Sequence, residues 1–240
     1  MRRLGLTLAI IMLSACGGGS SPSQPSATPT LTITGGTDLL LGGEASQFSA
    51  SQGTQTVSAT WASSEPSVAT VDTTGRAAGV GYGTTTISAA YQGSRSEKSL
   101  RVVPDYRGRW IGFPTVASCS ATGDHLRGGF CDPNREGWRV GLAQNFSFTL
   151  SQNRDSIDGA VTFSSWQGSF QGTVGTDGRL RGNANLSFTS ARGEITNARI
   201  DPWEGGISSG TMSGEFSCRV TVSSQSGEGI IQMRFTNLRR

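Results

Sequence analysis

The side chains most capable of chemistry lie in one short segment, between Cys119 and Cys131, which contains His125, the single histidine of the chain. The hydroxyls and carboxylates that a serine-type mechanism would use occur close to this histidine in the sequence: Ser118, Ser120, Asp124 and Asp132. A catalytic triad is recognised by the geometry of its three groups, and this segment lacks the pattern of a nucleophile elbow. We therefore expect His125 to be a solvated loop residue, the chain to have no catalytic residues, and the protein not to be an enzyme.

The same segment is a poor candidate for a metal or cofactor site. Zinc sites need several histidine or cysteine ligands at suitable spacing, and one histidine beside cysteines that can bond to each other does not supply them. No glycine-rich sequence falls between a strand pattern and a helix pattern, where it would cradle phosphate. We expect no metal and no cofactor.

The start of the chain has the pattern of a secretory signal. Two arginines, Arg2 and Arg3, precede an apolar run over residues 4–13, and small residues follow it. The run is too short for a membrane span, which needs about 20 apolar residues. We predict a signal peptide over residues 1–15.

The sequence Leu13-Ser14-Ala15-Cys16 resembles a bacterial lipobox. The resemblance implies that Cys16 is lipidated, becomes the first mature residue, and anchors the protein to a membrane through its lipid. Gly17, rather than aspartate, follows the cysteine and resembles outer-membrane sorting. We therefore expect a lipid-anchored cell-envelope protein at the outer membrane, facing the periplasm or the cell surface.

Export and lipidation also determine how the remaining cysteines can pair. Disulfides persist outside the cytoplasm, and Cys119, Cys131 and Cys218 are left once Cys16 carries lipid. Closing the loop from Cys119 to Cys131 would contribute about 3 kcal/mol in the chain-entropy model. We favour a Cys119–Cys131 disulfide, with a bond to Cys218 or fully reduced thiols as the alternatives.

Composition indicates an all-β protein with no affinity for nucleic acid. Without Arg2 and Arg3, 18 basic residues face 17 acidic ones, so no basic patch for nucleic acid is expected. Only 15% of residues are charged and 34 are glycine, which favours short strands and tight turns. Residues 16–30, which hold the lipidated cysteine and a stretch rich in glycine, serine and proline, are expected to form a flexible linker.

Residues 31–103 show short alternating strand patterns separated by turn residues, which indicate a β-sandwich. The stretch from Thr60-Trp61 through Pro66 to Val71-Asp72, together with Gly83-Thr84-Thr-Thr-Ile87-Ser-Ala89, resembles a bacterial immunoglobulin-like domain of group 2. The resemblance implies a non-catalytic module of surface proteins, adhesins and spacers, and it carries no site residue. Within it, Trp61, Val68, Val71 and Ile87 are expected to fill the space between the two sheets.

Residues 105–240 alternate strictly in polarity, which predicts a small antiparallel up-and-down β-barrel of about eight strands. Four of these strands carry a glycine on the apolar face: Gly159, Gly172, Gly182 and Gly214. Inward glycines either let strands curve into a barrel or leave space for a ligand, and we favour curvature.

The sequence Gly108-Arg109-Trp110 at the first of these strands resembles the calycin superfamily, which includes lipocalins. The resemblance implies a late basic residue packed across Trp110, here Arg234 or Arg239, and a small apolar ligand or a protein partner. Trp166 is expected to be exposed at the barrel mouth, where it could stack on a sugar or bind a partner. The candidate ligand-binding residues are Trp110, Phe146, Phe148, Trp166, Phe170 and Phe216.

These inferences favour a non-catalytic binding module in which the immunoglobulin-like domain presents the barrel to a small apolar ligand or to a surface or periplasmic protein. The alternative is a structural or adhesive surface protein in which both domains act as spacers. A barrel interior filled by its phenylalanines would argue against an internal ligand and for contacts through the surface.

Overall fold

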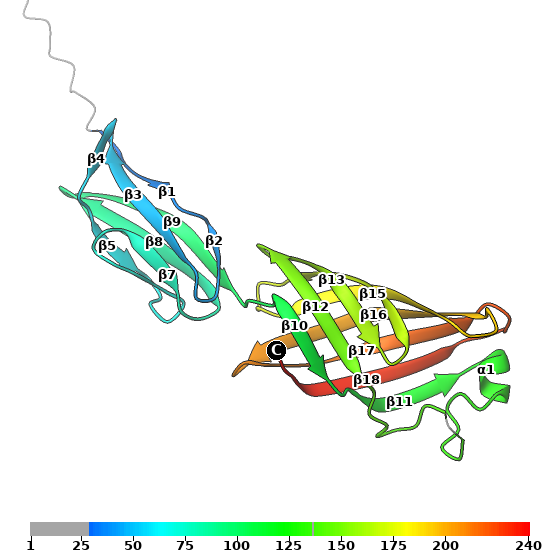
Figure 1. Cartoon of the computed structure of the whole chain (residues 1–240). Helices are drawn as coiled ribbons and strands as arrows, with labels where there is room; N and C mark the ends of the chain where they lie inside the picture. Colours follow the sequence, from blue (N-terminus) through cyan, green and yellow to red (C-terminus); the bar gives the residue numbers. More distant parts are fainter. Residues whose placement is uncertain (1–28, 136) are drawn as a thin grey trace, which may run out of the picture.

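The computed structural model describes residues 29–135 and 137–240. The predicted signal peptide, the lipidation site Cys16 and most of the predicted linker lie outside the described residues. The described chain is built almost entirely of β-strands, arranged as two units that follow one another along the sequence (Figure 1). The all-β prediction is therefore confirmed.

The first unit is a sandwich of two sheets. One sheet contains β1 (Leu31–Gly35), β3 (Ala45–Gln52), β7 (Arg76–Gly79) and β6 (Ala69–Val71) in that order, with β4 (Gln55–Val57) paired to β3. The other contains β2 (Leu39–Leu41), β9 (Ser94–Val103), β8 (Gly83–Tyr91) and β5 (Thr60–Ser63). Only β2 and β9 pair in parallel in this second sheet.

The space between the two sheets is filled as predicted. Phe48, Ile87 and Leu100 are fully buried there, and Val68 belongs to the same cluster. Trp61 and Val71 are partly buried and pack against that cluster. Alternation along each strand places these apolar side chains inward, because successive residues of a strand point to opposite faces.

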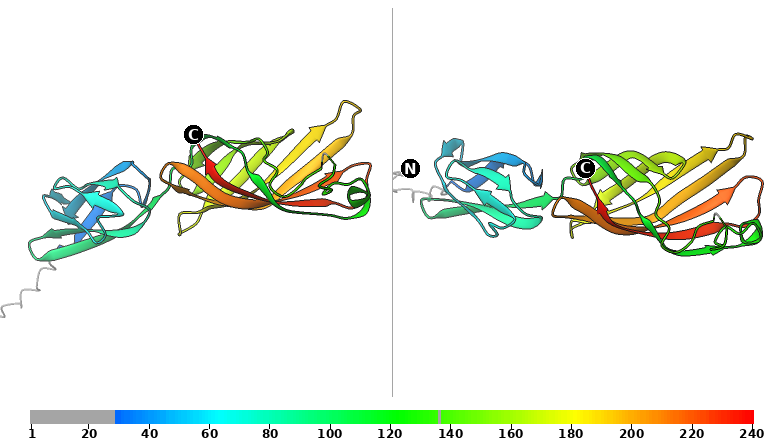
Figure 2. Two further views of the ribbon diagram at one scale, coloured as in Figure 1. Left: turned by 90° about the horizontal axis from the view of Figure 1, so that it is seen from below. Right: turned by 60° about the horizontal axis from the view of Figure 1, so that its bottom comes forward.

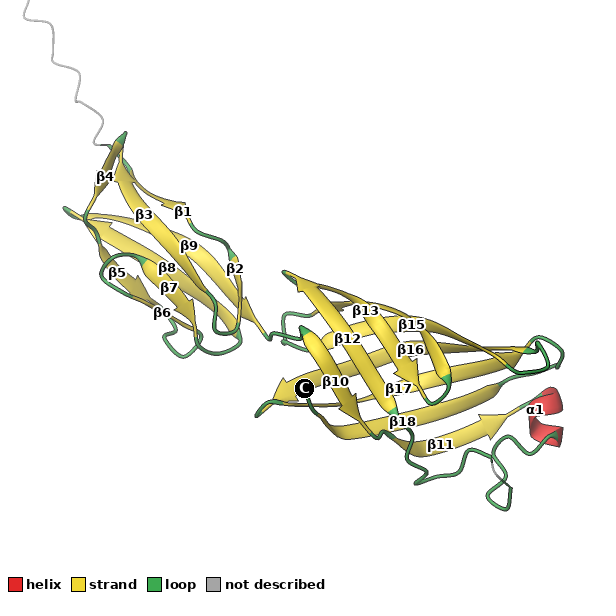
Figure 3. Ribbon diagram, in the orientation of Figure 1, coloured by secondary structure: helices red, strands yellow, loops and turns green. Residues whose placement is uncertain are grey.

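The second unit is one antiparallel sheet of nine strands. In sequence order these are β10 (Gly108–Gly112), β11 (Thr115–Ala121), β12 (Phe146–Asn153), β13 (Ser156–Phe163), β14 (Trp166–Val174), β15 (Leu180–Thr189), β16 (Ile195–Ser208), β17 (Thr211–Val222) and β18 (Gly229–Leu238). From β12 to β18 each strand pairs with the next along the chain, β10 pairs with β12, and β11 pairs with β18. A short helix, α1 (Gly123–Arg127), follows β11 at the end of the sheet far from the sandwich (Figure 3).

This sheet curls until its two ends meet (Figure 2). Ile111 of β10 and Arg239 exchange two backbone hydrogen bonds of 2.8 and 2.9 Å, which join the first strand to the end of the last. Since only Phe113 and Pro114 separate β10 from β11, these two strands form one bent strand. That bent strand pairs with β12 on one side and with β18 on the other. The sheet as a whole has nine strands, where the sequence predicted about eight.

Inward glycines mark places where neighbouring strands come very close. A Cβ atom on Gly182 would lie 2.3 Å from the carbonyl oxygen of Gln171 and 2.5 Å from the ring of Phe170. A Cβ atom on Gly214 would lie 2.0 Å from the carbonyl oxygen of Glu204. The structure thus favours the interpretation that these glycines allow curvature, because backbone and aromatic rings occupy the space beside them.

Aromatic side chains fill the barrel interior. The ring centroids of Phe146 and Phe148 are 4.6 Å apart, and those of Phe148 and Phe170 are 4.8 Å apart. Phe216 stacks on Phe146 at 5.5 Å. All four residues are buried in one apolar cluster, which is the packing that would argue against a ligand inside the barrel.

The sandwich covers the near end of the barrel. Leu39, Leu41 and Val103 of the sandwich belong to the same buried cluster as the barrel side chains, and so does Tyr106, which lies between β9 and β10. The guanidinium of Arg101 in β9 donates a hydrogen bond to the carbonyl oxygen of Val174 in β14, at 2.9 Å. The two units therefore share one continuous apolar interior.

Candidate functional site

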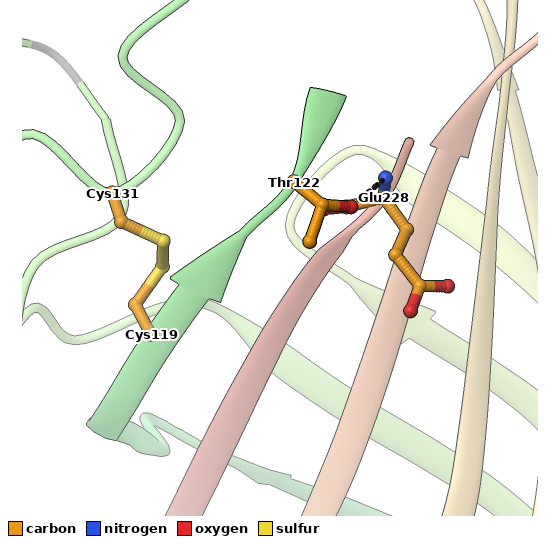
Figure 4. The surroundings of a disulfide bond; sticks show 4 residues. All are labelled: Cys119, Thr122, Cys131 and Glu228. Carbon is orange, nitrogen blue, oxygen red and sulfur yellow. Dashed lines mark hydrogen bonds between the residues drawn. A yellow bond between two sulfur atoms is a disulfide. The ribbon is translucent and has the colours of Figure 1, made fainter. Parts of the chain in front are cut away.

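Residues 119–135 and 137–142 connect β11 to β12 over the far end of the barrel. A disulfide joins Cys119, on β11, to Cys131, as the sequence predicts (Figure 4). Next to it, the Thr122 N–H donates to the carbonyl oxygen of Glu228 at 2.8 Å, and the Glu228 N–H donates to Thr122 Oγ1 at 3.1 Å. The disulfide and these hydrogen bonds hold the segment against the turn between β17 and β18.

His125 lies inside this segment and does not face solvent. Only 3% of its surface is exposed, and its ring packs edge-on against Phe130 with centroids 5.4 Å apart. The prediction of a solvated histidine is wrong, because the disulfide brings Phe130 back against α1, where it packs on the His125 ring.

The predicted serine and aspartate neighbours do not form a triad with this histidine. Neither ring nitrogen of His125 has a hydrogen-bond partner among the described residues. Ser118 and Ser120 are exposed on β11, and the Asp124 carboxylate accepts hydrogen bonds from Ser226 instead. These residues are close in the sequence but do not form the hydrogen bonds of a catalytic triad among the described residues.

Trp166 is buried and not exposed at a barrel mouth. Its side chain is 7% exposed and stacks on Trp138 at 5.7 Å, with Phe163 equally close to it. The prediction of an exposed aromatic is wrong, because the segment after the disulfide returns across the barrel end and places Trp138 over Trp166. This arrangement leaves the Trp166 indole without the exposed face that sugar stacking would need.

Trp110 also belongs to the interior. Its Nε1 donates a hydrogen bond of 2.8 Å to the carbonyl oxygen of Tyr106. The basic residue over its ring is Arg240, at 4.7 Å, and not the predicted Arg234 or Arg239. Each residue predicted to bind a ligand thus lies in the packed core: Trp110, Phe146, Phe148, Trp166, Phe170 and Phe216. Their role in ligand binding stays a prediction.

Two buried groups inside the barrel have raised pKa values. Burial raises the pKa of the Tyr106 hydroxyl to about 12, and that hydroxyl donates to the carbonyl oxygen of Gly178 at 2.8 Å. Burial likewise raises the pKa of the Cys218 thiol to about 12. Cys218 is unpaired and fully buried, so it packs as a small apolar residue.

A groove that the sequence analysis missed lies where β10 meets β12 and β18. Its volume is about 630 Å³, which is within the range of small-molecule sites. We call it the seam groove. Its lining residues include Arg109, Ile111, Phe113, Asn145, Ser147, Thr162 and Arg239.

The outer surface of four adjacent strands builds this groove. Ile111 of β10 pairs with Ser147 of β12, which pairs with Thr162 of β13, and on its other side Ile111 pairs with Arg239. Directly paired residues point to the same face, so this row faces outward together. A sequence signal for it existed: if Trp110 points inward, then strand alternation places the apolar side chain of Ile111 on the outward face.

The groove is apolar in part and its charged residues are basic. Phe113 and Ile111 expose 70% and 48% of their surfaces there. Arg109 and Arg239 line it without a carboxylate within ion-pair distance in the part of the chain that the structure describes, and no acidic side chain lines it. An apolar surface next to cations without partners favours an anionic amphiphile over a neutral or cationic one.

Within residues 29–135 and 137–240, no group of three or more histidine, cysteine or acidic side chains is placed to hold a metal ion. The helical part of that region includes no segment of the length and apolarity that crossing a membrane requires.

One part of the chain matches the model of a known protein family. Residues 43–91 match the model of the intimin immunoglobulin-like domain. The match runs from the turn before β3 to the end of β8, and thus through both sheets of the sandwich. A comparison with curated proteins finds no match to the chain. The sandwich is therefore an immunoglobulin-like domain, similar to the one in intimin.

Proposed function

We propose that this protein is a non-catalytic bacterial surface protein whose immunoglobulin-like domain presents the barrel, and that the barrel makes its contacts through its outer surface. The intimin-type domain supports a surface or adhesive role. The observation that carries the proposal is the filled interior, in which Phe146, Phe148, Phe170 and Phe216 pack on one another.

Side chains cover both ends of the barrel, which supports contacts through its outer surface. Tyr106 and the sandwich residues Leu39 and Leu41 cover the near end, while Phe130 and Trp138 pack against the core at the other. A ligand would have to displace one of these layers to reach the interior. The outer surface offers the seam groove without any such rearrangement.

A lipid anchor at Cys16 and an outer-membrane location complete the proposal. Both rest on the lipobox resemblance of residues 13–16. For the barrel, the contact of Arg240 with Trp110 is consistent with a distant calycin-like relationship. In this arrangement the sandwich holds the barrel away from the membrane. The shared apolar interior at the junction supports a fixed orientation between the two domains.

The anchoring part is tested by producing the full chain and its Cys16→Ala variant in a Gram-negative host. We expect incorporation of an alkyne-labelled fatty acid into the parent chain only, and release of the variant into the soluble envelope fraction. Equal labelling of both chains, or a cytoplasmic location of the parent, would contradict the proposal.

The contact part is tested by native mass spectrometry of the Cys16→Ala chain purified from the same host. With its interior filled by side chains, the folded protein is expected to retain no small molecule inside the barrel, so any added mass should be lost when the seam groove is changed. A retained small molecule that is unaffected by changes in the seam groove, but lost on Phe148→Ala substitution, would place the ligand inside the barrel and overturn the proposal.

A further inference from the structure

We infer that the seam groove binds a single-chain amphiphile with a carboxylate headgroup, its apolar part against Ile111 and Phe113 and its carboxylate at Arg109 and Arg239. This inference deepens the proposed function, on which it rests, by naming a ligand class for the outer surface of the barrel. Of the interior residues that the sequence suggested, only Phe146 reaches this site.

The position of the cations follows from strand register. Ile111 and Arg239 are direct partners and so share the outward face, and Arg109 and Phe113 are each two residues from Ile111 along the same chain. Arg109 therefore lies at one end of this face. Ile111 follows, with Arg239 beside it, and the exposed ring of Phe113 lies at the other end. This order of charge and apolar surface matches an amphiphile with one acidic end.

Neither Ile111 nor Phe113 belongs to a buried apolar cluster of the described residues. Phe113 lies between β10 and β11, where the strand bends, and is 70% exposed although its neighbours Gly112 and Pro114 are not. Large exposed apolar groups gathered at a groove mark interaction sites more often than single exposed residues do. Phe146, Phe235 and Leu238 reach the same groove from the core and extend its apolar lining.

Polar groups at the groove suit a carboxylate or its water shell. Ser147, Thr162 and Thr236 offer hydroxyl donors, and Asn145 and Asn237 offer amides. A guanidinium binds a carboxylate through two parallel N–H donors, which makes arginine the better choice for this headgroup than lysine. Arg239 Nε faces the Asn237 side-chain oxygen at 3.4 Å, a weak contact that a carboxylate would readily replace.

The experiment measures binding of three probes with the same alkyl chain to the full Cys16→Ala chain by isothermal titration calorimetry. The probes are dodecanoate, dodecanol and dodecyltrimethylammonium, each kept below its micelle concentration. We expect dodecanoate to bind at one site with an affinity at least about tenfold higher than that of the other two, and to weaken as salt is added.

Paired variants locate the site. Phe113→Ser is compared with Val140→Ser, because Val140 is also 70% exposed but does not line the groove. Arg109→Gln is compared with Arg192→Gln, an exposed arginine on the turn between β15 and β16. We expect Phe113→Ser and Arg109→Gln to weaken dodecanoate binding at least about fivefold, and both controls to leave it unchanged.

Equal affinity for the three probes, or equal effects of each variant and its control, would overturn the inference. Circular dichroism of every variant separates loss of the site from loss of the fold. A negative result here changes neither the lipid anchoring nor the absence of a ligand inside the barrel, so failure of this inference is distinct from failure of the proposed function.

Discussion

The guanidinium carbon of Arg240 lies 4.7 Å from the centroid of the Trp110 ring, so the segment after β18 covers the inward tryptophan of β10. The same guanidinium donates a hydrogen bond to the carbonyl oxygen of Asp105, just before Tyr106. Arg240 thus ties the end of the last strand to the junction between the domains. Together with the bridge between Ile111 and Arg239, it holds the first and last strands of the barrel together.

Replacing this arginine tests how much the contact contributes. We expect Arg240→Gln to lower the free energy of unfolding by at least about 0.5–1 kcal/mol, the usual contribution of a partly exposed cation–π contact, because it also removes the hydrogen bond to the Asp105 carbonyl oxygen. Arg239→Gln is the matched control, since Arg239 makes no cation–π contact with a described residue and its bridge to Ile111 uses only backbone atoms. Urea denaturation measures both, and equal losses would show that the ring contact has no special role.

The hydroxyl of Tyr106 is the second feature that connects the domain junction to the barrel. It donates to the Gly178 carbonyl oxygen and accepts from the Leu180 N–H at 3.2 Å, both at the start of β15 or just before it. Tyr106→Phe removes this partner from the half-buried Gly178 carbonyl oxygen and the buried Leu180 N–H, so we expect a loss of about 1–3 kcal/mol in unfolding free energy.

Tyr82→Phe is the control for this substitution, because its side chain is half exposed and its hydroxyl makes no hydrogen bond in the part of the chain that the structure describes. We expect almost no change there. If both variants unfold at the same denaturant concentration as the parent, water replaces the Tyr106 hydroxyl and the junction is looser than the hydrogen bonds indicate.

Strand content was predictable from the sequence, whereas the burial of the connecting segment was not. Alternation along β12 and β13 is strict, and period two has only one structural solution when one face is buried. His125 and Trp166 were misplaced because their burial depends on how the disulfide-bonded segment returns over the barrel end. No local pattern records that contact between Trp138 and Trp166, which are far apart along the chain.

For the seam groove, in contrast, the sequence already contained an indication of the exposed apolar surface. Ile111 on the outward side of β10, and Phe113 just after that strand, are exposed apolar residues next to the inward Trp110. What could not be predicted is the bend at Gly112–Pro114 and the pairing of Ile111 with Arg239, which together bring two cations to this face. Long-range register of this kind depends on closure of the whole sheet.

Gly182 tests whether the inward glycines serve curvature. A Cβ there would collide with the Gln171 carbonyl oxygen and the Phe170 ring, and the backbone atom cannot move without shifting β14. We expect Gly182→Ala to lower the unfolding free energy by about 1–3 kcal/mol through overpacking. Gly206→Ala on the neighbouring strand is the control, because the nearest atom to its Cβ would be 3.7 Å away. A stable Gly182→Ala variant would indicate free space beside the glycine.

Asp124 makes the stability of the disulfide-bonded segment depend on pH. The Ser226 backbone N–H, the Ser226 hydroxyl and Arg127 hold the pKa of this carboxyl well below its usual range. A depressed pKa in the folded state means that the contribution to stability is present above the unfolded pKa of about 4 and is lost as pH falls below it.

We therefore expect Asp124→Asn to lower the melting temperature at about pH 7, and to differ less from the parent at about pH 2.5. Asp158→Asn is the control, since that carboxylate makes no ion pair or side-chain hydrogen bond among the described residues. A difference between parent and Asp124→Asn that is independent of pH would show that the amide replaces the carboxylate fully.

Cys218 is expected to be inert in the folded protein. It lies between Ile200 and Ile231 on the neighbouring strands, and its burial raises the thiol pKa to about 12, so almost no thiolate forms near neutral pH. In the Cys16→Ala chain, Ellman's reagent should detect no thiol under native conditions at about pH 8 and one thiol in denaturant, because Cys119 and Cys131 stay bonded. Cys218→Ala should then show none in denaturant without reductant. Rapid labelling of the native chain would mean that the barrel wall between β16 and β18 opens readily, which the packing of aromatic rings in its interior argues against.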